Sequence, residues 1–109
     1  MGAQRTELLK GMLEGAVLEN LAAQPCHGYE LVTRLHRQGF SELAQSTVYS
    51  LLARAERRGL VSATHDSSIT GPPRKVFALT AQGREHLREF WRMWTLISDV
   101  LEHLRQESE

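Results

Sequence analysis

The sequence contains little of several residue types that mark whole classes of protein. It has one cysteine, three prolines, two tryptophans and two tyrosines among 109 residues, and its formal net charge is zero. Cys26 has no second cysteine with which to form an internal disulfide, so we expect a reducing, cytoplasmic setting. No apolar run reaches the roughly 20 residues that span a bilayer. We find no basic segment followed by an apolar one that would predict a leader peptide.

The sequence also lacks the motifs of common enzyme classes. It has no glycine-rich phosphate loop, no nucleophile elbow and no paired histidines of the zincin type. Cys26 and His27 are neighbours in sequence, but adjacency is not a catalytic geometry. We therefore expect no enzyme, no catalytic residue and no cofactor. With 41% hydrophobic residues, the length suits one domain with a modest core.

Hydrophobic periodicity predicts a mainly α chain with a small two-stranded β-wing. Apolar residues recur at helical spacing over residues 6–23, 29–38, 46–58 and 81–105. Alternating residues predict strands over 60–64 and 74–80, joined by a polar loop over 65–73. This order predicts a winged helix-turn-helix over residues 1–80, followed by a C-terminal dimerisation helix over 81–109, in one compact unit.

Short polar residues and glycines predict where these helices begin and end. Thr6, Ser46 and Thr80 are the expected N-caps of the first, third and last helices. Gly39 and Gly59 are expected to end the second and third helices, because glycine readily adopts the left-handed conformation.

The run from Ser46 to Val61 is the most informative part of the chain. Its apolar residues face a core when the run is helical, which leaves hydroxyl and guanidinium groups on the outer face: Ser46, Thr47, Tyr49, Ser50, Arg54, Arg57 and Arg58. Such groups contact phosphates and base edges of DNA. We expect this helix in a major groove, with Arg54 on a guanine or a phosphate. Arg57 and Arg58 are expected on phosphate or in solvent.

The distribution of charge supports a local DNA-binding face. Residues 34–75 carry seven arginine or lysine residues against three acidic ones, a net charge of +4, whereas the flanking segments are each −2. A basic middle between acidic ends is typical of such a face, although ordinary solvated charges give the same count. Arg74 and Lys75, on the second expected strand, are expected to contact phosphate or the minor groove.

The last expected helix carries a heptad pattern of apolar residues. Their spacing of three and four residues is typical of a helix that pairs with another helix: Leu87, Phe90, Trp94, Ile97, Leu101 and Leu104. A helix of this length exceeds what a small core covers, so we expect a homodimer interface. The alternative is that the stripe packs only on the first helix of its own chain.

Three neighbouring aromatic residues on this helix have two interpretations. Phe90, Trp91 and Trp94 would stack on a flat apolar ligand near a dimer centre, or they are large core residues. The sequence leaves both open.

Three segments of the chain resemble the PadR family of bacterial transcriptional regulators, in particular its short subfamily. They are His27–Leu31 (HGYEL), Ser46–Val61 and Gly71–Gly83. Their order and spacing are similar to those of the family from about Leu8 to Leu104. The sequence departs from the family pattern at Ser50, Ala55 and Ala78, where proline, leucine and tyrosine are common.

The resemblance implies a homodimeric winged helix, usually a repressor, that binds a near-palindromic operator. It implies that Tyr49, with Ser46, Thr47 and Ser50, approaches the DNA and that Arg74 and Lys75 serve the wing. Some short members bind flat aromatic compounds between the two final helices, which implies a ligand role for Trp91 and Trp94.

Two other functions fit parts of the sequence. A winged-helix module that binds only proteins would use the last helix but would leave the basic middle without a role. A metal sensor would need convergent ligands, and His86, Glu89, His103 and Glu107 stand one turn apart in two pairs on the last helix. Surface histidines explain this pattern with fewer assumptions, so we expect no metal site.

Overall fold

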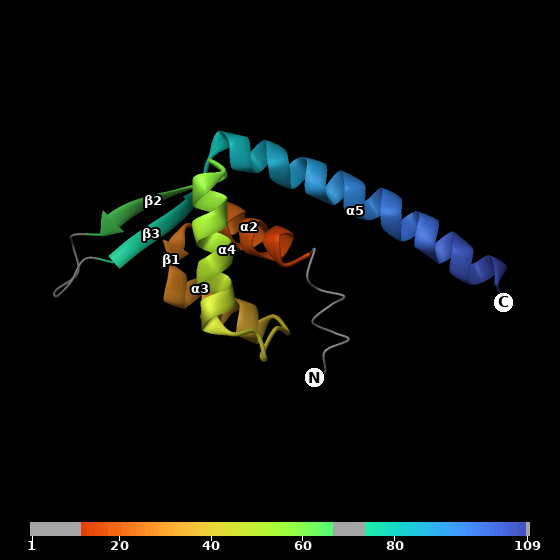
Figure 1. Cartoon of the computed structure of the whole chain (residues 1–109), viewed down its shortest axis with the longest axis horizontal. Coiled ribbons are helices and arrows are strands. Elements are labelled where there is room, and N and C mark those ends of the chain that lie inside the picture. Colours follow the sequence, from red (N-terminus) through yellow and green to blue (C-terminus); the bar gives the residue numbers. More distant parts are fainter. Residues whose placement is uncertain (1–11, 67–73, 109) are drawn as a thin grey trace.

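The computed structural model describes residues 12–66 and 74–108 of the chain. In order, the elements are α2 (Leu13–Ala23), β1 (Cys26–His27), α3 (Gly28–Arg37), α4 (Gln45–Arg57), β2 (Val61–Asp66), β3 (Arg74–Leu79) and α5 (Ala81–Glu107). The expected N-cap Thr6 and the loop tip at 67–73 lie outside the described residues. Figure 1 shows strands β2 and β3 projecting from one side of the body and α5 extending from the other.

The core lies where α2, α3 and α4 meet under the sheet. Its largest fully buried side chains are leucines and valines from these three helices: Val17, Leu18, Leu21, Leu31, Leu35, Val48 and Leu52. In α4, Val48, Leu52 and Ala55 are buried at helical spacing, as predicted, and Leu51 packs at the edge of the core. Phe77 of β3 closes the core from the sheet side.

The sheet has three antiparallel strands in the order β1-β3-β2, so the predicted two-stranded wing was incomplete. The third strand comes from the segment that the sequence marked only as a break: Cys26 pairs with Phe77, and His27 pairs with Val76. Two residues are too few to show an alternating pattern, and only pairing with β3 makes them a strand. β2 is also longer than predicted, because His65 and Asp66 continue the register opposite Lys75 and Arg74.

The helix ends follow the sequence signals with one exception. Gly39 and Gly59 have φ of +121° and +75°, which confirms that glycine allows the chain to leave α3 and α4. Thr80 is confirmed as the N-cap of α5, because its hydroxyl accepts a hydrogen bond from the Gly83 amide at 2.9 Å. The prediction that Ser46 caps α4 was wrong. That helix starts one residue earlier, after an extended Ala44, and no side chain caps it.

The last helix is anchored at its start and free of the body further along. α5 packs on α2 through Leu87, which lies in the core, and through Phe90, which is partly buried against it. From Met93 onward its large apolar side chains are exposed. At about 1.5 Å per residue, its 27 residues span roughly 40 Å, more than the body can cover.

Candidate nucleic-acid interface

The outer face of α4 presents the predicted DNA-contacting groups to solvent. Ser46, Tyr49, Ser50 and Arg54 are exposed, and Thr47 is partly buried. Tyr49 keeps 40% of its surface exposed although its ring contacts the body. The amphipathic pattern places these groups because Val48, Leu52 and Ala55 direct the opposite face into the core. The described geometry therefore leaves this face of α4 open to a partner.

A groove of about 750 Å³ lies beside α4 and brings three structural elements together. Tyr49 and Ala53 of α4 form one wall, and Gly28 and Tyr29 at the start of α3 form another. Strand β3 adds the side chains of Arg74, Lys75 and Phe77. Of the seven predicted DNA-contacting residues, Tyr49, Arg74 and Lys75 thus share this groove, whereas Ser46, Thr47, Ser50 and Arg54 lie on α4 outside its lining.

The floor of the groove depends on a close contact between Gly28 and Tyr49. A Cβ atom at Gly28 would lie 2.5 Å from Cε1 of Tyr49, which is well inside contact distance. The tyrosine ring therefore rests on the backbone where α3 begins. The positive end of the α3 helix dipole also lies at this point, which favours negative charge nearby.

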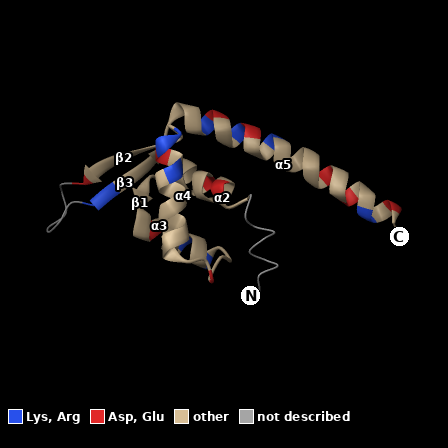
Figure 2. Ribbon diagram, viewed as in Figure 1, with Lys and Arg blue, Asp and Glu red and all other residues tan. Residues whose placement is uncertain are grey.

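Several exposed cations of α4 and β3 have no acidic partner among the described residues. Arg54, Arg57 and Arg74 form no ion pair within the described part of the chain, and all three are exposed. Lys75 lies 3.8 Å from Glu56 across the groove, a half-exposed pair that contributes little stability. Figure 2 shows the blue segments of arginine and lysine at the end of α4 and the start of β3.

The arginines of α5 differ, because most of them are neutralised within their own helix. Arg88, Arg92 and Arg105 each bind the glutamate three residues earlier. The pairing with Arg92 lowers the pKa of Glu89, through a hydrogen bond to the carboxylate. Figure 2 shows the resulting alternation of red and blue along α5. The unpaired positive charge at α4 and β3 is therefore not a general property of this surface.

Tyr29 is a residue at this groove that the sequence reasoning did not assign. It is 64% exposed, the largest exposed fraction among the chain's described large hydrophobic side chains. Tyr29 follows Gly28 in the HGYEL segment. A large aromatic residue at the exposed start of a helix was the sequence feature that could have identified it as a site residue. His27 also lines the groove, and its Nε2 lies 3.4 Å from Oδ2 of Asp66.

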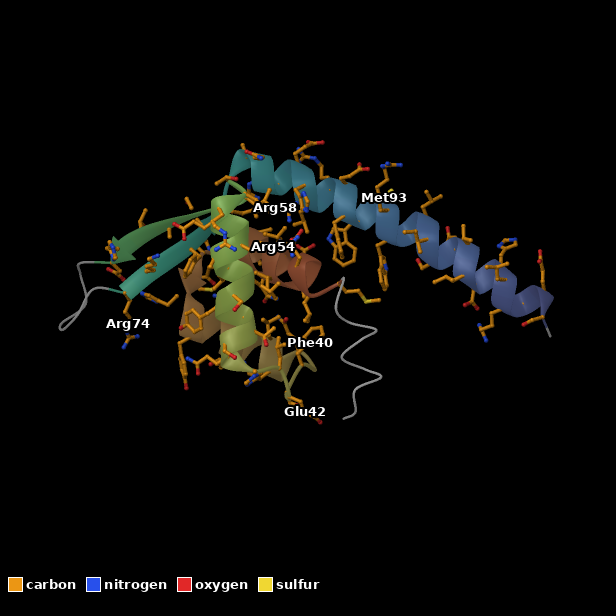
Figure 3. All side chains as sticks on the ribbon, in the orientation of Figure 1. Phe40, Glu42, Arg54, Arg58, Arg74 and Met93 are labelled. Carbon is orange, nitrogen blue, oxygen red and sulfur yellow. The ribbon has the colours of Figure 1, made fainter. Side chains whose placement is uncertain are left out.

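Arg58 is exposed, which is one of the two outcomes expected for it, and it also binds another helix. Its Nη1 donates to Oε2 of Glu14 on α2 at 2.8 Å. Figure 3 shows Arg58 at the end of α4, close to the first turns of α5. The remaining oxygen of Glu14 lies 2.7 Å from Nε2 of His86. One of the histidines considered as a metal ligand is therefore within hydrogen-bond distance of a carboxylate of α2.

The aromatic residues of α5 are not equivalent. The Phe90 ring packs against Gly15, where a Cβ atom would lie 2.2 Å from it. Nε1 of Trp91 donates to Oε1 of Glu19 on α2 at 2.7 Å. Trp94 is 40% exposed, and its indole has no hydrogen-bond partner within the described ranges. Of the three aromatic residues predicted to bind a ligand, Trp94 is the one least engaged by its own chain.

The predicted dimer interface divides into two parts. Leu87 was expected to face a partner, but it is only 7% exposed and belongs to the chain's own core, which corrects that assignment. The heptad continues on the exposed part of α5 with Trp94, Ile97, Leu101 and Leu104, which are 40–61% exposed. The alternative that the whole stripe packs on its own first helix is therefore wrong for the distal half of α5.

Two further observations concern sites of other kinds. Within residues 12–66 and 74–108, no group of three or more histidine, cysteine, aspartate or glutamate side chains is placed to hold a metal ion. None of the helices in this part of the chain combines the length and the hydropathy of a membrane span.

Helices α3 and α4, followed by paired strands β2 and β3, define a winged helix-turn-helix protein. The model of the PadR-like transcriptional regulator family matches residues 17–89. The chain belongs to this family. No similar protein is found among the curated proteins.

Solved structures agree with this membership over nearly the whole chain. A PadR-like regulator from Bacillus cereus is 36% identical, with 92% of this chain and 97% of that chain covered and a TM-score of 0.81. A Streptococcus transcriptional regulator is 37% identical, with 92% and 98% covered and a TM-score of 0.82. A PadR family regulator from Eggerthella lenta is 32% identical, with 94% and 88% covered and a TM-score of 0.86.

Proposed function

We propose that this protein is a cytoplasmic, homodimeric repressor that binds a near-palindromic DNA operator. In this proposal α4 is the recognition helix and lies in the major groove, and β2 and β3 form the wing. The observation that carries it is the exposed charge, without an ion pair among the described residues, of Arg54 and Arg57 on α4 and of Arg74 in the groove at Tyr49. Free guanidinium groups beside exposed hydroxyls match the chemistry of phosphates and base edges.

The groove itself suits the sugar–phosphate backbone between a recognition helix and a wing. Arg74 and Lys75 provide positive charge at one side, and the start of α3 provides amide groups and a favourable dipole at the other. Tyr29 and Tyr49 offer hydroxyl groups to phosphate and flat faces to deoxyribose. We therefore add Tyr29 to the residues that contact DNA.

The distal half of α5 is the proposed dimer interface. Its exposed apolar residues continue a heptad pattern, and a second copy of the chain supplies a matching stripe by symmetry. A two-fold dimer also presents two recognition helices to two half-sites, and such half-sites lie about 34 Å apart. Size-exclusion chromatography with light scattering tests this directly, and a monomer at micromolar concentration would contradict it.

The first experiment on the function is binding to DNA. Fluorescence anisotropy would compare the duplex upstream of the protein's own gene with a scrambled duplex, at two salt concentrations. Specific binding with a steep salt dependence supports the proposal, because phosphate contacts release counterions. Equally weak binding to both duplexes would favour the module that binds only proteins.

We further propose that a flat aromatic or hydrophobic effector binds between the two copies of α5 and releases the operator. Trp94 is best placed to stack on it, because Phe90 and Trp91 contact α2 of their own chain. Such a ligand acts only if it binds the two conformations with different affinity. Titration of Trp94→Phe and Trp91→Phe with a planar aromatic dye tests this: quenching should be lost in the Trp94 variant and retained in the other.

A further inference from the structure

The carboxylate of Glu14 joins three helices at one point. Glu14 lies in the first turn of α2 and is about one quarter exposed. One of its oxygens accepts a hydrogen bond from Arg58, the C-cap residue of α4, and the other lies 2.7 Å from Nε2 of His86 on α5. Both contacts connect segments far apart in sequence.

The end of α4 is also attached to the start of α5 by hydrogen bonds close to the chain connection. Nε2 of Gln82 donates to the Arg58 carbonyl at 3.3 Å, and the hydroxyl of Thr80 donates to the Gly59 carbonyl at 2.7 Å. These contacts hold the two helices together near one point, and Leu87 and Phe90 pack α5 on α2. His86 lies one turn beyond Gln82, so its bond to Glu14 adds a side-chain connection between α5 and Arg58 of α4 away from that point.

The donors at this junction match an ionised carboxylate. Two donors, a guanidinium N–H and an imidazole N–H, face the two oxygens of Glu14, and an ionised carboxylate accepts from both. A glutamine has the same shape but no charge: its oxygen accepts from Arg58 only as a neutral group, and its amide bonds to His86 only after Nε2 changes to the accepting tautomer. Glu14→Gln therefore weakens both attachments without removing side-chain volume.

We propose that Glu14 is a positioning residue that locks the recognition helix α4 and the helix α5 into one rigid unit. The orientation of α4 then follows the orientation of α5. This lock is a property of the single chain. Its consequence for DNA rests on the proposed function: in a dimer formed through α5, Glu14 would fix the distance between the two recognition helices.

The chain provides a matched control at Glu19. This second carboxylate of α2 also binds α5, through Nε1 of Trp91, but within the described residues it forms no hydrogen bond or ion pair with α4. Glu19→Gln removes the same charge from the same helix and weakens the same helix pair. A difference between the two variants therefore reports the connection to α4 and not general packing.

The test measures the distance between α4 and α5 within one chain by pulsed electron paramagnetic resonance. Nitroxide labels are attached at Ser50→Cys on α4 and Thr95→Cys on α5, both exposed positions, in a Cys26→Ala background. Labelled protein is diluted with an excess of unlabelled protein, so that the distance is intramolecular whether or not the chain dimerises. Thermal melts of each variant confirm that it is folded.

We expect a narrow distance distribution for the parent and for Glu19→Gln, and a broadened or shifted one for Glu14→Gln. Arg58→Gln tests the same lock from the α4 side, gives the same expected broadening, and replaces Glu14→Gln if that variant does not fold. Unchanged distributions in the Glu14 and Arg58 variants would overturn the proposal. Equal broadening in Glu19→Gln would also overturn it, because Glu14 would then have only a general packing role.

A second measurement connects the lock to DNA binding. If the operator is confirmed, moving its half-sites apart by one base pair, about 3.4 Å, should weaken binding of the parent more than binding of Glu14→Gln. An equal loss for both proteins would contradict the role in spacing while leaving the proposed function intact. Failure of the parent to bind any operator would instead contradict the proposed function, and the intramolecular distances would still decide the lock.

Discussion

The ring of Phe90 on α5 lies directly against the backbone of Gly15 on α2, where a Cβ atom would be 2.2 Å from two ring carbons. This contact sets how closely the two helices approach, and a side chain larger than that of glycine fits only if the Phe90 ring moves. It also explains why a helix interior contains a residue of low helix propensity.

Gly15→Ala should therefore destabilise the protein, although alanine favours a helix by about 1 kcal/mol over glycine. The ring must shift to admit the methyl group, and overpacking of this kind costs about 1–3 kcal/mol. Urea denaturation followed by circular dichroism measures the difference. The double variant Gly15→Ala with Phe90→Leu should recover part of the loss, and additive effects would contradict the contact.

Cys26 should react slowly with thiol reagents in the folded protein. Burial raises the pKa of its thiol above the ordinary value, with a smaller opposing effect from Arg34, so less thiolate is present at a given pH. Ellman's reagent should modify the native protein at a small fraction of the rate seen in guanidinium chloride. Equal rates in both states would show that the thiol is accessible.

The same shift predicts a loss of stability at alkaline pH. Above the ordinary thiol pKa of about 8.5, Cys26 in the unfolded chain loses its proton while the folded chain retains it. Unfolding is then favoured as the pH rises, until the folded thiol also ionises. Urea melts at increasing pH should show this loss in the parent and a smaller one in Cys26→Ala. Parallel pH profiles for the two proteins would contradict the assignment.

Replacing Tyr49 or Arg54 by alanine should weaken operator binding by about 1–3 kcal/mol if either residue contacts a base. Arg92→Ala is the matched control for Arg54, because Arg92 is an exposed arginine whose partner is Glu89 on its own helix. Anisotropy titrations should show unchanged affinity for the control. Unchanged affinity in both test variants would remove the outer face of α4 from the DNA contacts.

Arg74→Ala should act on all DNA sequences alike. A phosphate contact contributes to the salt dependence of binding, so its removal should reduce the slope of log K against log salt by about one. The slope is measured on the operator and on a scrambled duplex. If the slope stays as steep as in the parent, the wing arginine does not contact phosphate.

Ile97→Glu should convert the proposed dimer to monomers. Ile97 is 52% exposed in the single chain, so a charge there costs little in the monomer but would be buried without a partner in a dimer. Thr95→Glu, on an exposed position of the same helix without an apolar side chain, is the control. Light scattering would decide, and a dimer that survives Ile97→Glu would move the interface elsewhere.

The parts of the fold that the sequence predicted well are those with strong local signals. The faces of α3 and α4, the glycine ends and the Thr80 cap follow from spacing and backbone chemistry within one segment. Strand β1 was missed because its two residues become a strand only by pairing with β3, fifty positions away in the sequence. Local patterns contain no information about such a pair.

The site was predictable only in part for the same reason. The exposed face of α4 could be derived from its own periodicity, but the groove needs Gly28 of α3 against Tyr49 of α4. The contact of Arg58 was not predicted and Leu87 was assigned to the wrong surface, because their partners, Glu14 and the core, come from other elements. The spacing of residues in the sequence predicts which face of a helix a side chain occupies. Which residue that side chain contacts depends on the tertiary structure.

The exposed outer half of α5 has a consequence for how such a chain can change over time. Beyond Trp91, the helix contributes no buried side chain within the described residues, whereas α4 and its groove are built entirely from the body. If the chain dimerises through α5 as proposed, substitutions at Leu96, Val100 or Leu104 would alter which copies assemble without disturbing the surface proposed to read DNA. The specificity of dimerisation and the specificity for a DNA sequence would then vary independently. Duplicated copies of such a chain could diverge without forming mixed dimers.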